Sequence, residues 1–235
     1  MAPIMPGEGI AARPLHFMWI VDCSGSMQVD GKMAQLNNAI KEALPEMQEV
    51  VSSQPFCEMF VRAIAFSSGA NWVVSQPTPV ADFKWNDLQA EGVTDMGAAF
   101  EQVADQLSVE KMGQRGYPPV LVLISDGQPT DDWKKGLKRL LDQNWGKRAS
   151  RIAIAIGKDA DHEPLKAFVN NPEIPVLQAN NPQRLTQYIK WASAVVSKSV
   201  VAPPSKTAEA AGSGAGPLPP LLPLPEPGAA DDDVW

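Results

Sequence analysis

Residues 15–27 read LHFMWIVDCSGSM, and this stretch decides how the chain folds. Residues 17–21 are a continuous apolar run that does not alternate with polar side chains. Such a run is typical of a strand covered on both faces, as in a parallel sheet. The run stops at Asp22, after which two serines and a glycine allow a sharp turn. The stretch therefore predicts a buried strand that delivers a carboxylate and two hydroxyls into one tight loop.

The loop offers hard oxygen ligands, namely the Asp22 carboxylate and the hydroxyls of Ser24 and Ser26. Parallel strands end in the crevice where open α/β sheets bind their ligands. A carboxylate with neutral hydroxyls suits Mg²⁺, which takes about six oxygens near 2.1 Å, better than it suits zinc. The alternative is that these residues only cap a helix that starts near Asp30.

Two later segments supply further oxygen ligands. The sequence GVTDMG at residues 92–97 places Thr94 in a loop before a helix, and LVLISDG at residues 121–127 is a second apolar strand that ends at Asp126. The set Asp22-x-Ser24-x-Ser26, Thr94 and Asp126 resembles, position by position, the metal-ion-dependent adhesion site of von Willebrand factor A domains.

The resemblance covers about residues 14 to 200 and implies a site that holds Mg²⁺, Mn²⁺ or Ca²⁺. It implies that the hydroxyls ligate the metal, that the aspartates act mostly through water, and that one coordination position stays open for a Glu or Asp of a protein partner. Residues 124–133, ISDGQPTDDW, are most similar to the TerY-like members of the family, from tellurite-resistance and stress gene clusters. Those bacterial proteins are often encoded beside a protein kinase and a PP2C-type phosphatase, which implies a role as scaffold or adaptor in such signalling.

The expected function is therefore metal-dependent protein binding without catalysis. An Mg²⁺-dependent phosphatase or phosphotransferase is the alternative, because an apolar strand ending in aspartate also begins such sites. That alternative requires a second carboxylate two residues on, where this chain has Ser24, and a lysine nearby. A scaffold whose metal site is vestigial is a third possibility. His16 and His162 are isolated, lack metal-ligand spacing, and are expected to be structural or surface residues.

Composition restricts the class of partner. The 235 residues carry a formal net charge of −7, and four of these charges lie after Val200, which leaves a mildly acidic remainder of −3 without a basic block for nucleic acid. No segment approaches the ~20 apolar residues that span a bilayer, and residues 1–14 lack the pattern of a signal peptide. We therefore expect a cytoplasmic protein. The two cysteines, Cys23 and Cys57, are too few for a disulfide scaffold.

Three regions follow: an N-terminal extension (1–13), an A domain (14–200) and a disordered tail (201–235) rich in Gly, Ala and Pro. Strands and helices alternate through the central region. The expected segments are helices at 32–53, 95–109, 164–170 and 182–196 and a further helix that starts within 127–133, with strands at 15–22, 56–66, 71–76, 121–125, 151–156 and 176–178. The fold class is thus α/β, a doubly wound and mostly parallel sheet with helices on both faces and one antiparallel edge strand.

Several residues leave alternatives open. Pro45 should kink its helix or split it in two. Trp85 could belong to an interface or cover the sheet edge. Thr130 or Asp131 is the expected N-cap of the helix that follows, and Asp131 and Asp132 could reach the metal rim, although acidic residues there more often complement a helix dipole. The leucines among the prolines of the tail and its Trp235 favour a docking motif over an inert linker.

Overall fold

The computed structural model describes residues 12–201 and Trp235. Most of the expected N-terminal extension, and the tail from 202 to 234, lie outside the described residues. The described part forms one six-stranded sheet in the order β3-β2-β1-β4-β5-β6. The strands are β1 (Arg13–Asp22), β2 (Cys57–Ser67), β3 (Gly69–Pro79), β4 (Val120–Ser125), β5 (Ser150–Ile156) and β6 (Leu177–Ala179).

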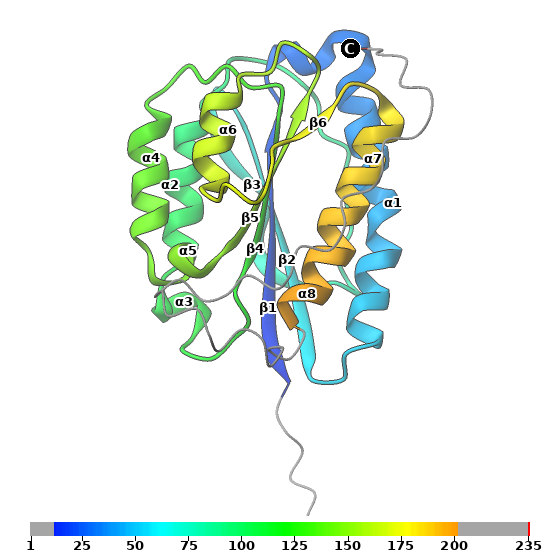
Figure 1. Cartoon of the computed structure of the whole chain (residues 1–235), viewed down its shortest axis with the longest axis vertical. Helices are drawn as coiled ribbons and strands as arrows, with labels where there is room; N and C mark the ends of the chain where they lie inside the picture. The colour runs from blue at the N-terminus through cyan, green and yellow to red at the C-terminus, as the bar shows by residue number, and fades with distance from the viewer. Residues whose placement is uncertain (1–11, 202–234) are drawn as a thin grey trace, which may run out of the picture.

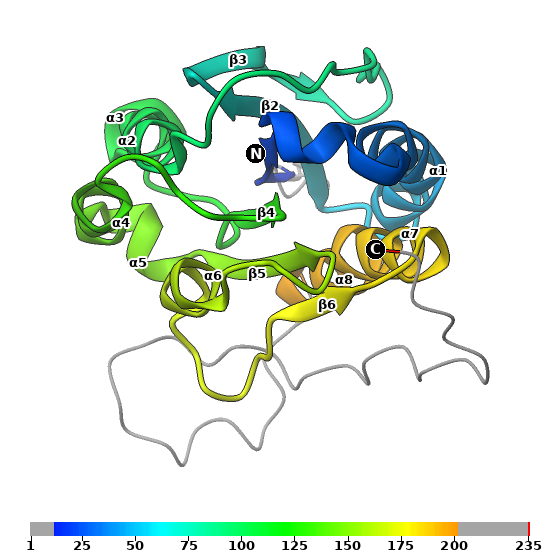
Figure 2. The ribbon, with the colours of Figure 1, turned by 90° about the horizontal axis from the view of Figure 1, so that it is seen from above.

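Helices cover both faces of this sheet, as the fold class predicts (Figures 1 and 2). On one face lie α1 (Lys32–Ser52), α7 (Pro182–Lys190) and α8 (Ser197–Val201), with the π-helical turn η2 (Trp191–Val196) between the last two. On the other face lie α2 (Met96–Gln106), α4 (Trp133–Asp142), α5 (Asn144–Arg148) and α6 (His162–Val169), with the short α3 (Val109–Met112) after α2. A 3₁₀ segment, η1 (Gly25–Gly31), joins β1 to α1.

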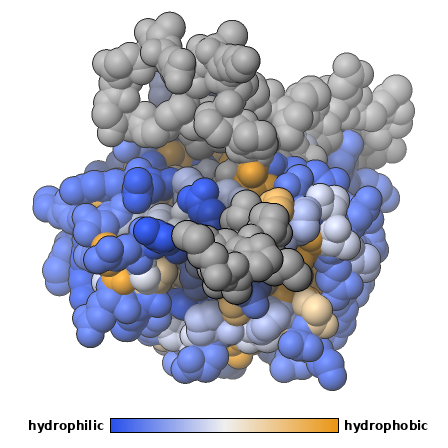
Figure 3. Space-filling model, turned by 90° about the horizontal axis from the view of Figure 1, so that it is seen from below, coloured by the Kyte–Doolittle hydropathy of each residue, from blue (hydrophilic) through white to orange (hydrophobic). Residues whose placement is uncertain are grey.

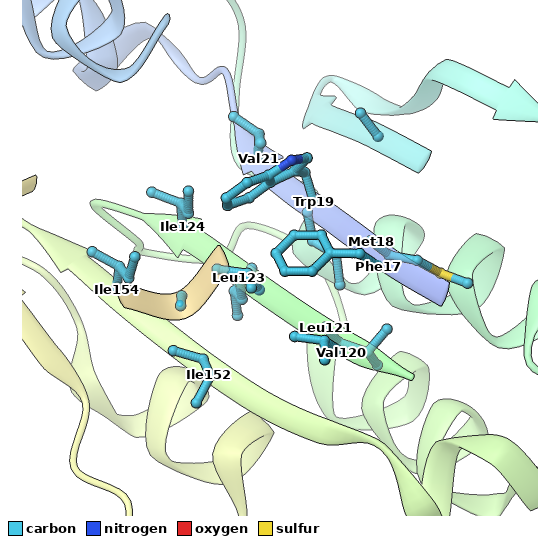
Figure 4. Packing of buried hydrophobic residues seen from close by; sticks show 14 of the residues in the cluster. Phe17, Met18, Trp19, Val21, Val120, Leu121, Leu123, Ile124, Ile152 and Ile154 are labelled. Carbon is cyan, nitrogen blue, oxygen red and sulfur yellow. The ribbon is translucent and has the colours of Figure 1, made fainter. Parts of the chain in front are cut away.

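The quoted apolar run forms the central strand. β1 pairs in parallel with β2 on one side and with β4 on the other, and its residues 15–22 are all buried. Phe17 and Trp19, two residues apart, share one face of β1, and their rings meet edge to face at a centroid distance of 4.7 Å (Figure 4). A strand covered on both faces has no solvent side, which is why its sequence does not alternate.

β2 and β3 form an antiparallel hairpin, and β3 is the predicted antiparallel edge strand. The chain reverses at Ser68, and Gly69 takes a left-handed φ of 83° that favours glycine. The loop after β3 then runs along α1. There Trp85 is buried and its indole N–H donates to Asn37 Oδ1 at 2.9 Å, while Asn37 also accepts from the backbone N–H of Leu88. Trp85 therefore anchors this loop to α1, so it is not available to an interface.

Several boundaries differ from the expectation or were not predicted, and three of them have a clear cause. α1 continues through Pro45 as one helix, because Pro45 lies on its exposed side while Ala43 and Met47 hold the helix on the core. The expected helix at 95–109 ends at Gln106, and Ser108 caps the separate α3 by accepting from the N–H of Lys111. The segment after α4 forms its own short helix, α5, because Gln143 adopts an extended conformation between the two.

The two ends of the sheet differ in what they expose. Where described residues are visible, the end at which β1 begins is mostly hydrophilic, with small apolar patches (Figure 3). The carboxyl ends of the parallel strands gather at the opposite end, together with η1 and the loops before α2, α4 and α6 (Figure 2). That end holds the predicted metal ligands.

Candidate metal centre

Adjacent parallel strands bring the predicted ligands to one edge. Asp22 is the last residue of β1, and Asp126 directly follows β4, whose Ile124 pairs with Val21. Ser24 and Ser26 lie in the turn that leads from β1 into η1. The topology therefore places two carboxylates and two hydroxyls, separated by about a hundred residues of chain, within one loop cluster.

Asp22 is completely buried, and two donors hold its carboxylate in place. The backbone N–H of Ser24 donates to Oδ1 at 2.8 Å, and the hydroxyl of Ser125 donates to Oδ2 at 2.5 Å. Burial raises the pKa of Asp22 from 3.8 to about 6, against the lowering effect of these hydrogen bonds and with a smaller raising effect from nearby Asp126. The carboxylate is thus preorganised but lacks a full counter-charge, and a divalent cation would supply one.

The remaining oxygens form a hydrogen-bonded chain. Ser24 Oγ lies 3.0 Å from Ser26 Oγ, and the Ser26 hydroxyl donates to Asp126 Oδ1 at 2.8 Å. Adjacent oxygens of an octahedral ion with bonds near 2.1 Å lie about 3.0 Å apart. The oxygens of the three side chains therefore already have the mutual spacing of neighbouring ligands, and the donor set fits a hard divalent ion.

Thr94 joins this cluster through its loop. The N–H of Gly25 donates to the carbonyl of Gly92 at 3.0 Å, and Thr94 itself is buried, with its N–H donating to Thr130 Oγ1 at 3.1 Å. Gly92 has a φ of 79°, and a Cβ there would lie 2.5 Å from Ser68 Oγ, so only glycine fits. The hydrogen bonds that join the other four residues do not include the Thr94 hydroxyl, so its role as a ligand rests on the position of the loop.

Sequence reasoning missed Lys32. This first residue of α1 places its ammonium 3.1 Å from Asp126 Oδ2, and its side chain is only 13% exposed. A lysine ten residues after Asp22 carries no signal by itself, because only the path of η1 turns it back towards β4. The ion pair partly neutralises Asp126 and supplies a positive charge beside the place where a metal ion would bind.

The two aspartates before α4 stabilise helix ends. Asp131 accepts hydrogen bonds from the backbone N–H groups of Gly97 and Ala98, at 2.9 and 2.8 Å, in the first turn of α2. Asp132, and neither Thr130 nor Asp131, is the N-cap of α4, since it accepts from the N–H of Lys135. Negative charge at both helix N-termini agrees with the helix-dipole interpretation.

Cys23 packs inward from the metal loop. It is buried, and its burial, with a smaller effect of Asp22, raises the pKa of its thiol to about 12. A thiol that holds its proton this strongly is a poor nucleophile and a poor metal ligand at neutral pH. Among the described residues, no three His, Cys, Asp or Glu side chains cluster as a metal site, so the candidate centre depends on its hydroxyls.

The α/β sheet has a buried central strand and an Asp-x-Ser-x-Ser loop at its carboxyl edge, and these features are those of a class of interaction domain. Comparison with known protein families identifies the family. The model of the von Willebrand factor type A domain matches residues 18–191, so the chain belongs to this family. Domains of this family are protein-interaction modules. No curated protein matches the chain at a significant level.

Solved structures agree on the fold. The chain is similar to a von Willebrand factor type A protein from Catenulispora acidiphila, with 19% identity and a TM-score of 0.62 over 80% of this chain and 43% of that one. It is also similar to the ArnB paralog VWA2 from Sulfolobus acidocaldarius, with 17% identity and a TM-score of 0.54 over 77% and 45% of the two chains.

A third similar structure is proximal thread matrix protein 1 of the mussel byssus, which has a zinc-occupied MIDAS motif. Its identity is 17% and its TM-score 0.58, over 78% of this chain and 49% of that one. The chain thus spans less than half the length of these three proteins. At such identities the likeness shows the fold alone. Within the described residues, no helix combines the length and the apolar character needed to cross a bilayer.

Proposed function

We propose that this chain is a non-enzymatic protein-binding module whose binding depends on a divalent ion. The ion is held by Asp22, Ser24, Ser26, Thr94 and Asp126, and a partner protein supplies a Glu or Asp to its open coordination position. The observation that carries the proposal is the chain of oxygens from Ser24 through Ser26 to Asp126, spaced 3.0 and 2.8 Å apart. In this arrangement the hydroxyls ligate the ion directly and the two aspartates act mostly through water, so no carboxylate of this chain binds the ion directly, which favours an acidic ligand from outside.

The surface around the site supports a protein partner. Val29 in η1 is 54% exposed and Val93, next to Thr94, is 47% exposed, and both belong to the loops that form the candidate centre. Exposed aliphatic side chains beside a polar anchor are typical of a surface that another protein covers. A partner carboxylate would supply the polar anchor, and these valines would supply apolar contact.

Mg²⁺ is the proposed ion, with Mn²⁺ and Ca²⁺ as alternatives. The ligands are hard oxygens, and the absence of imidazole or thiolate from the set disfavours zinc, although the mussel protein shows that a MIDAS motif can hold zinc. Ions of variable coordination number such as Ca²⁺ would need more ligands than these side chains supply, so water would complete the shell.

The site has one of the two features that the phosphatase alternative requires, the nearby lysine, and lacks the other, the second carboxylate. Lys32 provides the lysine that such a site requires, at 3.1 Å from Asp126. The second carboxylate two residues after Asp22 is replaced by Ser24, whose hydroxyl contacts Ser26. Neither histidine has a described contact with the candidate ligands: His16 lies near the start of β1, and Nε2 of His162 contacts Gln178 Oε1 in β6. We therefore favour binding over catalysis.

The same proposal extends to the pathway and the cellular location in which the protein acts. The segment ISDGQPTDDW supports a TerY-like adaptor or scaffold, located in the cytoplasm, that serves a bacterial stress response or a signalling pathway with a protein kinase and a PP2C-type phosphatase. Asp131 and Asp132 of this segment stabilise α2 and α4, so part of the similarity reflects the fold rather than a partner-specific surface.

A thermal-shift measurement tests the metal site first. Mg²⁺ at about a hundred times its Kd should stabilise the wild type by about 2.7 kcal/mol through mass action, and Asp22→Ala should abolish the effect. Asp159→Ala is the matched control, because Asp159 is an exposed carboxylate in the loop between β5 and α6 and should leave the Mg²⁺ response unchanged. An equal response in Asp22→Ala would contradict the site.

The same variants then test the function. Immobilised wild type should capture a partner from an extract of the native cells in Mg²⁺ and should release it in EDTA. The immobilised Asp22→Ala variant should capture no partner. Asp159→Ala should behave as wild type. Capture that persists in EDTA would mean that the metal face is not the interface, even if the thermal shift confirms the metal.

A further inference from the structure

Trp235 lies against the folded domain at the metal end of the sheet. Its backbone N–H donates to the carbonyl of Asn180 at 3.1 Å, and its indole Nε1–H donates to the carbonyl of Asp30 at 3.2 Å. The side chain is half-buried and packs against the hydrophobic core. Figures 1 and 2 place this end of the chain, marked C, beside η1 and near β6. Residue 235 is thus held by main-chain groups from two separate elements.

The groups that receive Trp235 form a small notch, which we define by Asp30, Gly157 and Asn180. Asn180 follows β6, the edge strand of the sheet, and its carbonyl accepts from the backbone N–H of Trp235 as an edge-strand carbonyl would from an added strand. Asp30 lies just before α1 in a left-handed conformation, φ 52°, and its carbonyl is outside the hydrogen-bond pattern of that helix.

Gly157 provides the floor of the notch. It has a φ of 81°, and a Cβ built on it would lie 3.7 Å from Cβ of Trp235 and 3.1 Å from Nζ of Lys32. A side chain at this position would therefore occupy the space between Trp235 and Lys32. Because Lys32 also pairs with Asp126, the notch is separated from the candidate metal centre by a single side chain.

We propose that the notch is a tryptophan-binding site next to the metal centre, and that Trp235 of this chain is its intramolecular occupant. Tryptophan suits it because an indole combines a large apolar surface with one N–H that needs an acceptor. The Asp30 carbonyl supplies the acceptor, the core supplies the apolar contact, and Asn180 fixes the main chain as an added strand residue would be fixed on a sheet edge.

The sequence predicted a docking motif in the tail, and the position of Trp235 gives this residue a different role. Trp235 instead binds its own domain. A tethered occupant acts at an effective concentration on the order of mM, so a modest intrinsic affinity is enough to fill the notch. A partner that approaches the metal from this side shares space with Trp235, but the inference itself requires neither metal nor partner.

The first test compares the amide spectra of full-length wild type and Trp235→Ala by NMR in metal-free buffer. Shift changes should concentrate at Asp30, Gly31, Gly157 and Asn180, and the indole N–H of Trp235 should exchange slowly with water in the wild type. Changes confined to the residues that adjoin 235 in sequence would overturn the proposal. Trp235→Phe, which keeps an aromatic ring but loses the N–H donor, should give a partial effect at Asp30.

The second test supplies the occupant as a separate molecule. A fluorescent peptide of residues 229–235, AADDDVW, should bind full-length Trp235→Ala at least fivefold more tightly than it binds wild type, where Trp235 competes for the notch. The peptide AADDDVA, matched in length and charge, should bind neither protein. Equal binding of the two peptides, or equal binding of AADDDVW to both proteins, would overturn the proposal. The experiment is done in EDTA, so its outcome is independent of the proposed metal-dependent function.

Discussion

Two neighbouring strands each bury a charged side chain, and the two side chains differ in how many hydrogen-bond partners they have. Asp22, at the end of β1, receives hydrogen bonds from Ser24 and Ser125 on both carboxylate oxygens. Arg62, in the middle of β2, is also buried, but its guanidinium has one described hydrogen bond, from Nη1 to Gln106 Oε1 at 3.2 Å. Among the described residues its Nε has no partner, nor has Nδ1 of the buried His16 on β1.

The difference is between a buried carboxylate whose two oxygens both accept hydrogen bonds and a buried cation that has few partners. Asp22 lies at the strand end, where the neighbouring loop and β4 supply hydrogen-bond donors. Arg62 and His16 lie among apolar side chains, and burial, followed by the positive charge of Arg62, lowers the pKa of His16 from 6.5 to about 4. A deeply buried group without a counter-charge responds to pH by losing its own charge.

The largest expected effect is at His16. Folded His16 stays neutral where the unfolded chain is protonated, so its contribution to stability is complete above pH 6.5 and lost as pH falls towards 4. The loss amounts to about 3 kcal/mol. His16→Phe, which keeps a ring beside Phe60, should remove this contribution, so in urea unfolding the variant should gain stability relative to the wild type at pH 4 compared with pH 7. A difference between variant and wild type that is the same at both pH values would show that His16 accepts a proton in the fold.

Asp22 should produce the opposite slope in metal-free protein. The folded state retains a proton that the unfolded chain has lost between pH 3.8 and about 6, so stability is complete below 3.8 and falls as pH rises through 6. The loss is again about 3 kcal/mol, and Asp22→Asn should abolish it. Because the two slopes oppose each other, the free energy of unfolding of the wild type should change little between pH 4 and pH 7. Each variant should show only the slope of the group that it retains.

Mg²⁺ provides the control for that experiment. A bound ion favours the Asp22 carboxylate, so saturating Mg²⁺ should stabilise the wild type more at pH 7 than at pH 5 and should leave Asp22→Asn unaffected. A metal effect that does not depend on pH would mean that the ion does not act on the Asp22 carboxylate.

The smallest effect concerns the donors around Asp22. Ser125→Ala removes the hydrogen bond to Asp22 Oδ2 and the acceptor for the N–H of Gly127, and it should lower the free energy of unfolding by about 1–3 kcal/mol. Ser52→Ala is the control, because its exposed hydroxyl bonds only the carbonyls of Gln48 and Glu49 at the end of α1. It should change stability by no more than about 0.5 kcal/mol. Equal losses in the two variants would show that the Asp22 network is not specially stabilised.

Much of the fold follows from local pattern. The unalternating runs of β1 and β4, the helical spacing of α1 and the turn at Ser67-Ser68-Gly69 each specify an element and its type through short-range sterics and burial. Boundaries were less predictable, since Pro45 is tolerated on a solvent-facing side and Ser108 starts a new helix where the periodicity continues. These details depend on which side of a helix the tertiary packing covers, and local pattern does not record that.

The sequence by itself determined the nature of the candidate site, because an apolar strand that ends in Asp-x-Ser-x-Ser, a threonine loop and a second strand that ends in aspartate restrict both chemistry and family. Only the tertiary structure decided the neighbours of that site. Lys32 pairs with Asp126, Asp131 caps α2, and Trp235 reaches Asp30 and Asn180. These contacts join residues from 33 to 205 positions apart. Their formation depends on strand order and loop path, which no local sequence pattern encodes.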